Sequence, residues 1–80
     1  MKTFESSNWG SDTLEACRDI VRAKSDGADI IVHEGEFSTE GDHHLSTISN
    51  ACVDSGVELV LKGVHDPGTV YPHITFVEES

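Results

Sequence analysis

The side chains of this 80-residue chain that are best suited to catalysis or metal binding are two cysteines and five histidines. They are Cys17, Cys52, His33, His43, His44, His65 and His73. A zinc ion needs three or four converging nitrogen, sulfur or oxygen ligands, and no two of the histidines have a helical ligand spacing such as His-x-x-x-His. On a helix, adjacent side chains such as His43 and His44 diverge by about 100°. The sequence therefore predicts no metal site and no cofactor.

The two cysteines fall on apolar stripes of segments that we expect to be helical. A thiol buried among apolar side chains has a raised pKa and is unreactive, so we expect Cys17 and Cys52 to belong to the core. A nucleophilic group that combines a cysteine with His33, His65 or Asp66 stays open as an alternative, but no spacing requires it. Because no catalytic motif is present, we predict a protein that is not an enzyme.

Acidic side chains dominate the composition: 15 aspartates and glutamates face five lysines and arginines, which gives a formal net charge of −10. Contacts with nucleic acid phosphates or an anionic membrane need cations, so this charge opposes both kinds of binding. It favours a partner protein with a basic surface. The alternative is an acidity that serves only solubility, as in a housekeeping domain of a halophile.

The acidic residues are densest between positions 34 and 42. Two aromatic side chains lie in or near expected loops, and large aromatics are common anchors of protein interfaces. The predicted partner-binding residues are therefore Glu34, Glu36, Glu40, Asp42, Trp9 and Phe37. For Trp9, the alternative is a partly buried cover over the start of the first helix.

Strand-like and helix-like segments alternate along the chain. The predicted strands cover residues 3–6, 28–33, 57–64 and 69–77. The first predicted helix begins after Asp12, an N-cap with Glu15 three residues later, and ends before Gly27. The second begins at Thr39 or Asp42 and ends before Gly56. Pro72 cannot donate to a sheet hydrogen bond, which places the last strand at an edge or a bulge.

This order, β-α-β-α-β-β, predicts a single domain over residues 1–80 of the α/β class, with a charged tail at 78–80 that frays. Right-handed crossovers place both helices on one face of a four-stranded sheet. A turn at Asp66-Pro67-Gly68 makes the last two strands antiparallel, so the predicted fold is a two-layer sandwich with a mixed sheet. The other sheet face is left solvated or available for docking. The predicted core consists of Leu14, Cys17, Val21, Ile30, Val32, Leu45, Ile48, Cys52, Leu59, Leu61, Ile74 and Phe76.

The order of elements resembles that of the TusA-like sulfur carriers, and also that of the C-terminal domain of a bacterial initiation factor and of the Alba chromatin proteins. The sulfur carriers have a Cys-Pro pair at the start of the first helix, where this chain has Ser11-Asp12. The nucleic-acid-binding relatives are basic, whereas this chain is acidic. The resemblance therefore extends to topology and transfers no functional residue. A sulfur-carrier-like or thiol-based protein remains an alternative function.

The features together favour a small acidic protein-interaction module. In its sharpest form it is an inhibitor that covers a nucleic-acid-binding surface of its partner, as small phage and anti-CRISPR inhibitors of similar size and acidity do. No apolar stretch approaches the roughly 20 residues that span a bilayer, and the first residues lack the hydrophobic core of a signal peptide. We therefore expect a cytoplasmic location.

Overall fold

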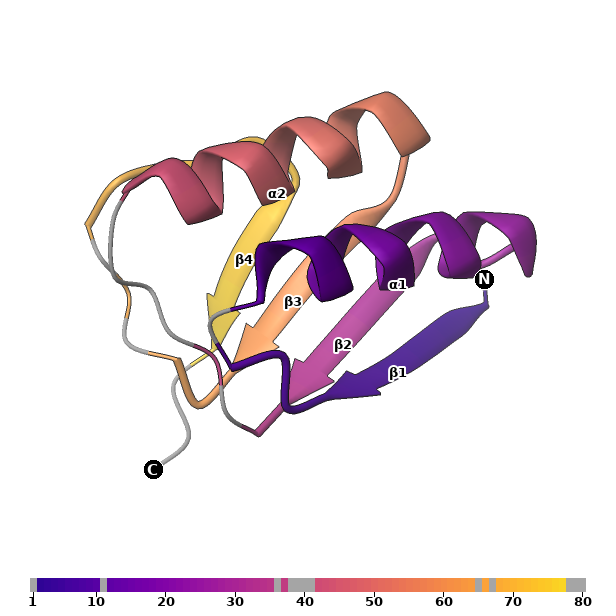
Figure 1. Cartoon of the computed structure of the whole chain (residues 1–80), viewed down its shortest axis with the longest axis horizontal. Coiled ribbons are helices and arrows are strands. Elements are labelled where there is room, and N and C mark those ends of the chain that lie inside the picture. The colour runs from indigo at the N-terminus through magenta and orange to yellow at the C-terminus, as the bar shows by residue number, and fades with distance from the viewer. Residues whose placement is uncertain are drawn as a thin grey trace.

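The computed structural model describes residues 2–10, 12–35, 37, 42–64, 66 and 68–77, with only the backbone for Asp42 and His43. Its elements are β1 (Thr3–Ser7), α1 (Thr13–Ser25), β2 (Ile30–Glu34), α2 (Asp42–Ser55), β3 (Glu58–Lys62) and β4 (Ile74–Val77). The strands form one sheet in the order β1-β2-β3-β4, and both helices lie over the same face of it (Figure 1). The predicted α/β class and the two layers are confirmed.

The sheet is entirely parallel, so the prediction of an antiparallel final pair was wrong. Asp66 does form a tight turn, in which its carboxylate accepts a hydrogen bond from the Gly68 N–H at 2.8 Å, but this turn does not join two strands. The described residues between β3 and β4 instead return the chain along the helix layer, where the Ser49 hydroxyl of α2 donates to the Pro72 carbonyl at 2.6 Å. This segment takes the place of a crossover helix, and β4 therefore starts at Ile74 in the parallel direction.

Helix α1 begins and ends where the sequence predicts. The Asp12 carboxylate accepts a hydrogen bond from the Glu15 N–H at 3.1 Å, which satisfies one of the free donors of the first turn. Gly27 follows the helix with a φ of +79°, a conformation that glycine adopts without strain.

The buried face of α1 differs from the predicted one. Its buried residues are Ala16, Asp19, Ile20 and Ala23. Two predicted core residues, Leu14 and Val21, have 60% and 59% of their surface exposed, and Cys17 is only partly buried. Alanines allow the helix to approach the sheet closely, and Asp19 is hydrogen-bonded beneath it. A prediction from hydrophobicity alone gave the wrong buried face for α1, because the buried side includes the carboxylate of Asp19.

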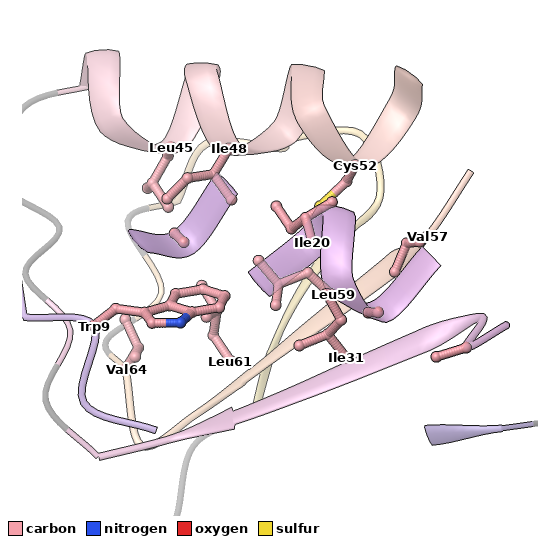
Figure 2. Packing of buried hydrophobic residues seen from close by; sticks show 13 residues of the cluster. Trp9, Ile20, Ile31, Leu45, Ile48, Cys52, Val57, Leu59, Leu61 and Val64 are labelled. Atoms are coloured by element: carbon pink, nitrogen blue, oxygen red, sulfur yellow. The ribbon is translucent and has the colours of Figure 1, made fainter. Parts of the chain in front are cut away.

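The core lies between the helices and the sheet (Figure 2). Leu45, Ile48, Cys52, Leu59 and Leu61 are buried there as predicted, and Ile74 and Phe76 pack against it from β4. Strand β2 has the opposite phase from the prediction: Ile31 and His33 are buried against the helices, whereas Ile30 and Val32 are half-buried on the other face. A continuous apolar run cannot specify which alternate residues point inward.

Candidate interaction surface

The face of the sheet opposite the helices carries no covering element among the described residues (Figure 1). The residues that point to this open face alternate with the core residues along each strand. They are Thr3, Glu5, Ser7, Ile30, Val32, Glu34, Glu58, Val60, Lys62, Thr75 and Val77. Parallel sheets usually have both faces covered, so an open face on an all-parallel sheet is unusual.

The centre of the open face is apolar. Val32 on β2 is aligned with Val60 on β3, and both are half-buried. Ile30 continues this patch along β2. At its two sides Glu5 is aligned with Val32, and Thr75 with Val60. The open face therefore consists of aliphatic side chains with polar residues beside them, which is the usual arrangement of a protein interface.

Carboxylates surround this apolar centre. Glu5, Glu34 and Glu58 are exposed, and the single lysine of the face, Lys62, lies 3.5 Å from the Glu34 carboxylate. At the other end of the strands, the His73 ring nitrogen Nδ1 lies 3.3 Å from the Glu58 carboxylate. The three carboxylates outnumber the one lysine, so the rim of the open face is negative.

The surface is hollowed where the strands end. One shallow pocket of about 240 Å³ is lined by Glu5, Ser6, Ser7, Val32, Glu34 and Lys62. A second, of about 410 Å³, is lined by Glu34, Gly35, Lys62 and Gly63. They share Glu34 and Lys62, and thus lie next to each other at the carboxyl ends of β1, β2 and β3. Ligands of open parallel sheets bind at this end of the strands.

The predicted site residues do not all gather on one surface. Glu34 lies on the rim of the open face, as described above. Glu36 and Glu40 fall outside the described residues, and Asp42 begins α2 with only its backbone described. Phe37 is partly buried and packs against the core. Of the four predicted acidic residues, the structure therefore describes the side chain of Glu34 alone.

Trp9 is buried, with only 2% of its surface exposed (Figure 2). Its indole ring packs edge-on against Phe37 at a centroid distance of 5.8 Å. The expectation that Trp9 is an exposed anchor for a partner was wrong, and the alternative, a cover beside the start of α1, describes its position better. The reason is that the indole N–H finds an acceptor inside the protein.

That acceptor is Asp19 of α1, which organises a buried polar cluster of Ser6, Trp9, Asp19 and His33. The Asp19 carboxylate accepts hydrogen bonds from the Trp9 indole at 2.7 Å and from the Ser6 hydroxyl at 2.5 Å. It also lies 3.3 Å from the Arg22 guanidinium. These partners explain how a carboxylate that is 8% exposed is tolerated. No motif in the sequence indicates this cluster.

His33 is fully buried at the end of β2. Its Nε2 accepts a hydrogen bond from the Trp9 backbone N–H at 3.2 Å, and its ring lies 4.3 Å from the indole ring. Its Nδ1 has no hydrogen-bond partner among the described residues. Burial lowers the pKa of the imidazole, and the Asp19 carboxylate only partly opposes this effect. The one sequence signal was a histidine that directly follows Ile-Ile-Val.

Cys52 has the properties of a core thiol, whereas Cys17 lies outside the buried core. Cys52 is buried, and burial is the main cause that raises the pKa of its thiol to about 12. Burial also raises the pKa of Cys17, which is partly buried. Neither thiol therefore forms much thiolate near neutral pH. The ring contacts and the hydrogen bond that the structure gives His33 are with Trp9 and Phe37, not with a cysteine.

No family model, curated protein or solved structure matches the chain. The topological resemblance to sulfur carriers and nucleic-acid-binding domains therefore has no support from these comparisons. Within the described residues, no group of three or more histidine, cysteine or acidic side chains could hold a metal ion. Neither of the two described helices has the length and apolarity to span a membrane.

Proposed function

We propose that this protein is an acidic interaction module that docks through its open sheet face onto a basic surface of a partner protein. The observation that carries the proposal is the uncovered face of an all-parallel sheet, with Val32 and Val60 at its centre and carboxylates at its rim. Proteins rarely leave such a face to solvent. A partner would supply the layer that covers this face.

The chemistry of the face defines the partner. Its centre should be covered by apolar side chains, since each Å² of apolar surface removed from water contributes about 25 cal/mol. Its rim should face lysines and arginines, because Glu5, Glu34 and Glu58 need opposite charges when water is excluded. The net charge of −10 extends this attraction beyond the contact itself and favours rapid association.

A nucleic-acid mimic is the most specific form of this function. In that form the carboxylates take positions that phosphates occupy on the partner, and binding blocks the partner's access to nucleic acid. The acidity of the chain supports this form, because a surface built for phosphates attracts carboxylates for the same electrostatic reason. Heparin, a polyanion, should then compete with the protein for its partner.

The test is capture from cell lysate by immobilised wild-type protein and two charge variants. Val60→Arg places a cation at the centre of the open face. Val53→Arg adds the same charge on α2, where Val53 is 45% exposed. Circular dichroism first establishes that both variants are folded. We expect wild type and Val53→Arg to retain the same protein, Val60→Arg to lose it, and salt or heparin to release it.

Equal retention by Val60→Arg and Val53→Arg would contradict docking through the open face. Retention that neither salt nor heparin reduces would contradict the electrostatic part of the proposal. If wild type retains nothing specifically, the acidity serves solubility, and the protein should then lose stability when salt is withdrawn.

A further inference from the structure

The segment between β1 and α1 has left-handed residues on both sides of Trp9. Asn8 has a φ of 55° and Gly10 a φ of 60°. Asparagine adopts the left-handed conformation more readily than other residues with a side chain, and surrounding contacts keep Asn8 in it. One is the hydrogen bond from the Asn8 N–H to the Glu34 carbonyl at 3.2 Å. Trp9 holds the same segment through its hydrogen bonds to His33 and Asp19, and Gly10 forms a β-bridge with Phe37.

The hydrogen bond between Trp9 and His33 requires a neutral imidazole. The Trp9 backbone N–H can donate only to an unprotonated Nε2. A proton on Nε2 turns this nitrogen into a donor, so two N–H groups would face each other at a buried position. The Trp9 amide would then have lost its acceptor, and a buried donor without a partner is unfavourable.

We propose that Trp9 and His33 form a proton-operated contact, in which protonation of Nε2 releases residues 8–10 from the carboxyl end of β2. A proton from solvent binds the Nε2 lone pair, and the hydrogen bond from the Trp9 N–H breaks. The left-handed Asn8 then lacks part of what held it. Residues 8–10 relax, and the indole moves out of the core while the sheet and helices persist.

The residues around His33 also favour release of residues 8–10 when the imidazole is protonated. On the sheet its neighbours are Ser6 of β1 and Leu61 of β3, neither of which carries charge. Phe37 packs against the ring and is also uncharged. From α1 the ionisable group that acts on it is Asp19, which is itself paired with Arg22. An imidazolium would compete with the Trp9 indole for the Asp19 carboxylate, so one proton weakens both hydrogen bonds that Trp9 donates, while the Trp9 carbonyl still accepts from the Asp12 N–H.

The change would reach the candidate interaction surface. Asn8 is bonded to the Glu34 carbonyl, and Glu34 lines both pockets at the carboxyl ends of the strands. Release of residues 8–10 would therefore alter one end of the open face and expose a large aromatic side chain beside it. The release itself needs no partner, and its test is independent of the proposed function.

Fluorescence tests the release directly, because Trp9 is the only tryptophan. Emission and far-ultraviolet circular dichroism are recorded between about pH 8 and about pH 4.5, the range in which histidines titrate. We expect a reversible shift of the emission to longer wavelength with a midpoint below pH 6.5, because burial lowers the pKa of His33. The circular dichroism should stay constant through this shift.

Two variants assign the transition. His33→Gln offers an amide oxygen that can accept the Trp9 N–H but does not titrate in this range, so the shift should disappear. His73→Gln removes another histidine, one that lies beside Glu58 at the opposite end of the strands, and should leave the shift unchanged. A shift that persists in His33→Gln overturns the proposal. So does a wild-type emission that changes only together with the circular dichroism.

Nuclear magnetic resonance of the wild type gives a second test if His33→Gln fails to fold. The backbone and indole N–H resonances of Trp9 should move with the same midpoint as the ring protons of His33. Titration of His33 without any change at Trp9 would overturn the proposal.

Discussion

The two faces of the sheet use the same kinds of side chain for different purposes. Leu59 and Leu61 of β3 are fully buried beneath the helices, whereas Val60 between them is only half-buried on the open face. The strand alternation places a stabilising residue and a surface residue next to each other in the sequence. A hydrophobic strand therefore does not by itself identify the core, and the side chains that could bind a partner must be found from the face they occupy.

The largest effect that separates the two faces is expected from truncation within β3. Leu59→Ala should lower the free energy of unfolding by about 2–5 kcal/mol, because it leaves a cavity in the packed core. Val60→Ala is the matched control on the open face and should cost less than about 1 kcal/mol. Urea unfolding measures both. A similar loss for the two variants would mean that the open face contributes to folding as much as the covered face.

Substitutions in the buried polar cluster on the covered face should lower the free energy of unfolding less than Leu59→Ala does. Trp9→Phe removes the indole N–H from the Asp19 carboxylate, which keeps Ser6 and Arg22 as partners, and the loss of one hydrogen bond to a charged group costs about 1.5–3 kcal/mol. The same change in an Asp19→Asn background gives a double-mutant cycle. A coupling energy near zero would show that this hydrogen bond contributes little.

The stability of the protein should depend on pH through His33. Burial makes the folded-state pKa of His33 lower than that of the unfolded chain, so the unfolded state binds a proton more readily. The free energy of unfolding should then fall as the pH drops below 6.5, the usual value for histidine. His33→Gln should remove this part of the pH dependence in urea unfolding, whereas His73→Gln should retain it. The reverse pattern would assign the pH dependence to His73.

The smallest effect is expected at a predicted core residue that the structure exposes. Leu14 is 60% exposed on α1, so Leu14→Ala should change the free energy of unfolding by less than about 0.5 kcal/mol. Ile20→Ala on the buried side of the same helix is the control and should cost about 2–5 kcal/mol. Comparable losses of stability for the two variants would mean that Leu14 lies on the buried side of α1, as its hydrophobicity predicts.

These contrasts show which parts of the structure the sequence could predict. Local sequence signals were sufficient to predict the Asp12 cap, the turn at Gly27 and the buried stripe of α2. The direction of β4 could not be predicted, because it depends on long-range contacts such as the hydrogen bond from Ser49 of α2 to the Pro72 carbonyl. A turn motif in the sequence, such as that at Asp66, carries no information about this long-range contact.

The candidate site was predictable only in part. The sequence indicated an uncovered sheet face and an acidic surface, but it placed Val32 in the core and Trp9 at the surface. Both errors have the same physical cause. Burial of Trp9, Asp19 and His33 depends on hydrogen bonds between residues that are distant in the sequence, and no local pattern reports such partners.

The central claim is that the open face, rather than acidity in general, binds the partner. Its most direct test is the association rate of the captured partner, measured by surface plasmon resonance at about 0.1 M and about 1 M salt, between which the Debye length falls from about 10 Å to about 3 Å. Glu5→Gln with Glu34→Gln removes two charges from the rim, and Asp26→Asn with Asp54→Asn removes two exposed charges at the ends of the helices. We predict that high salt slows association, and that at low salt the rim variant associates more slowly than the helix variant. Equal rates for the two variants, or a rate that does not change with salt, would contradict the claim.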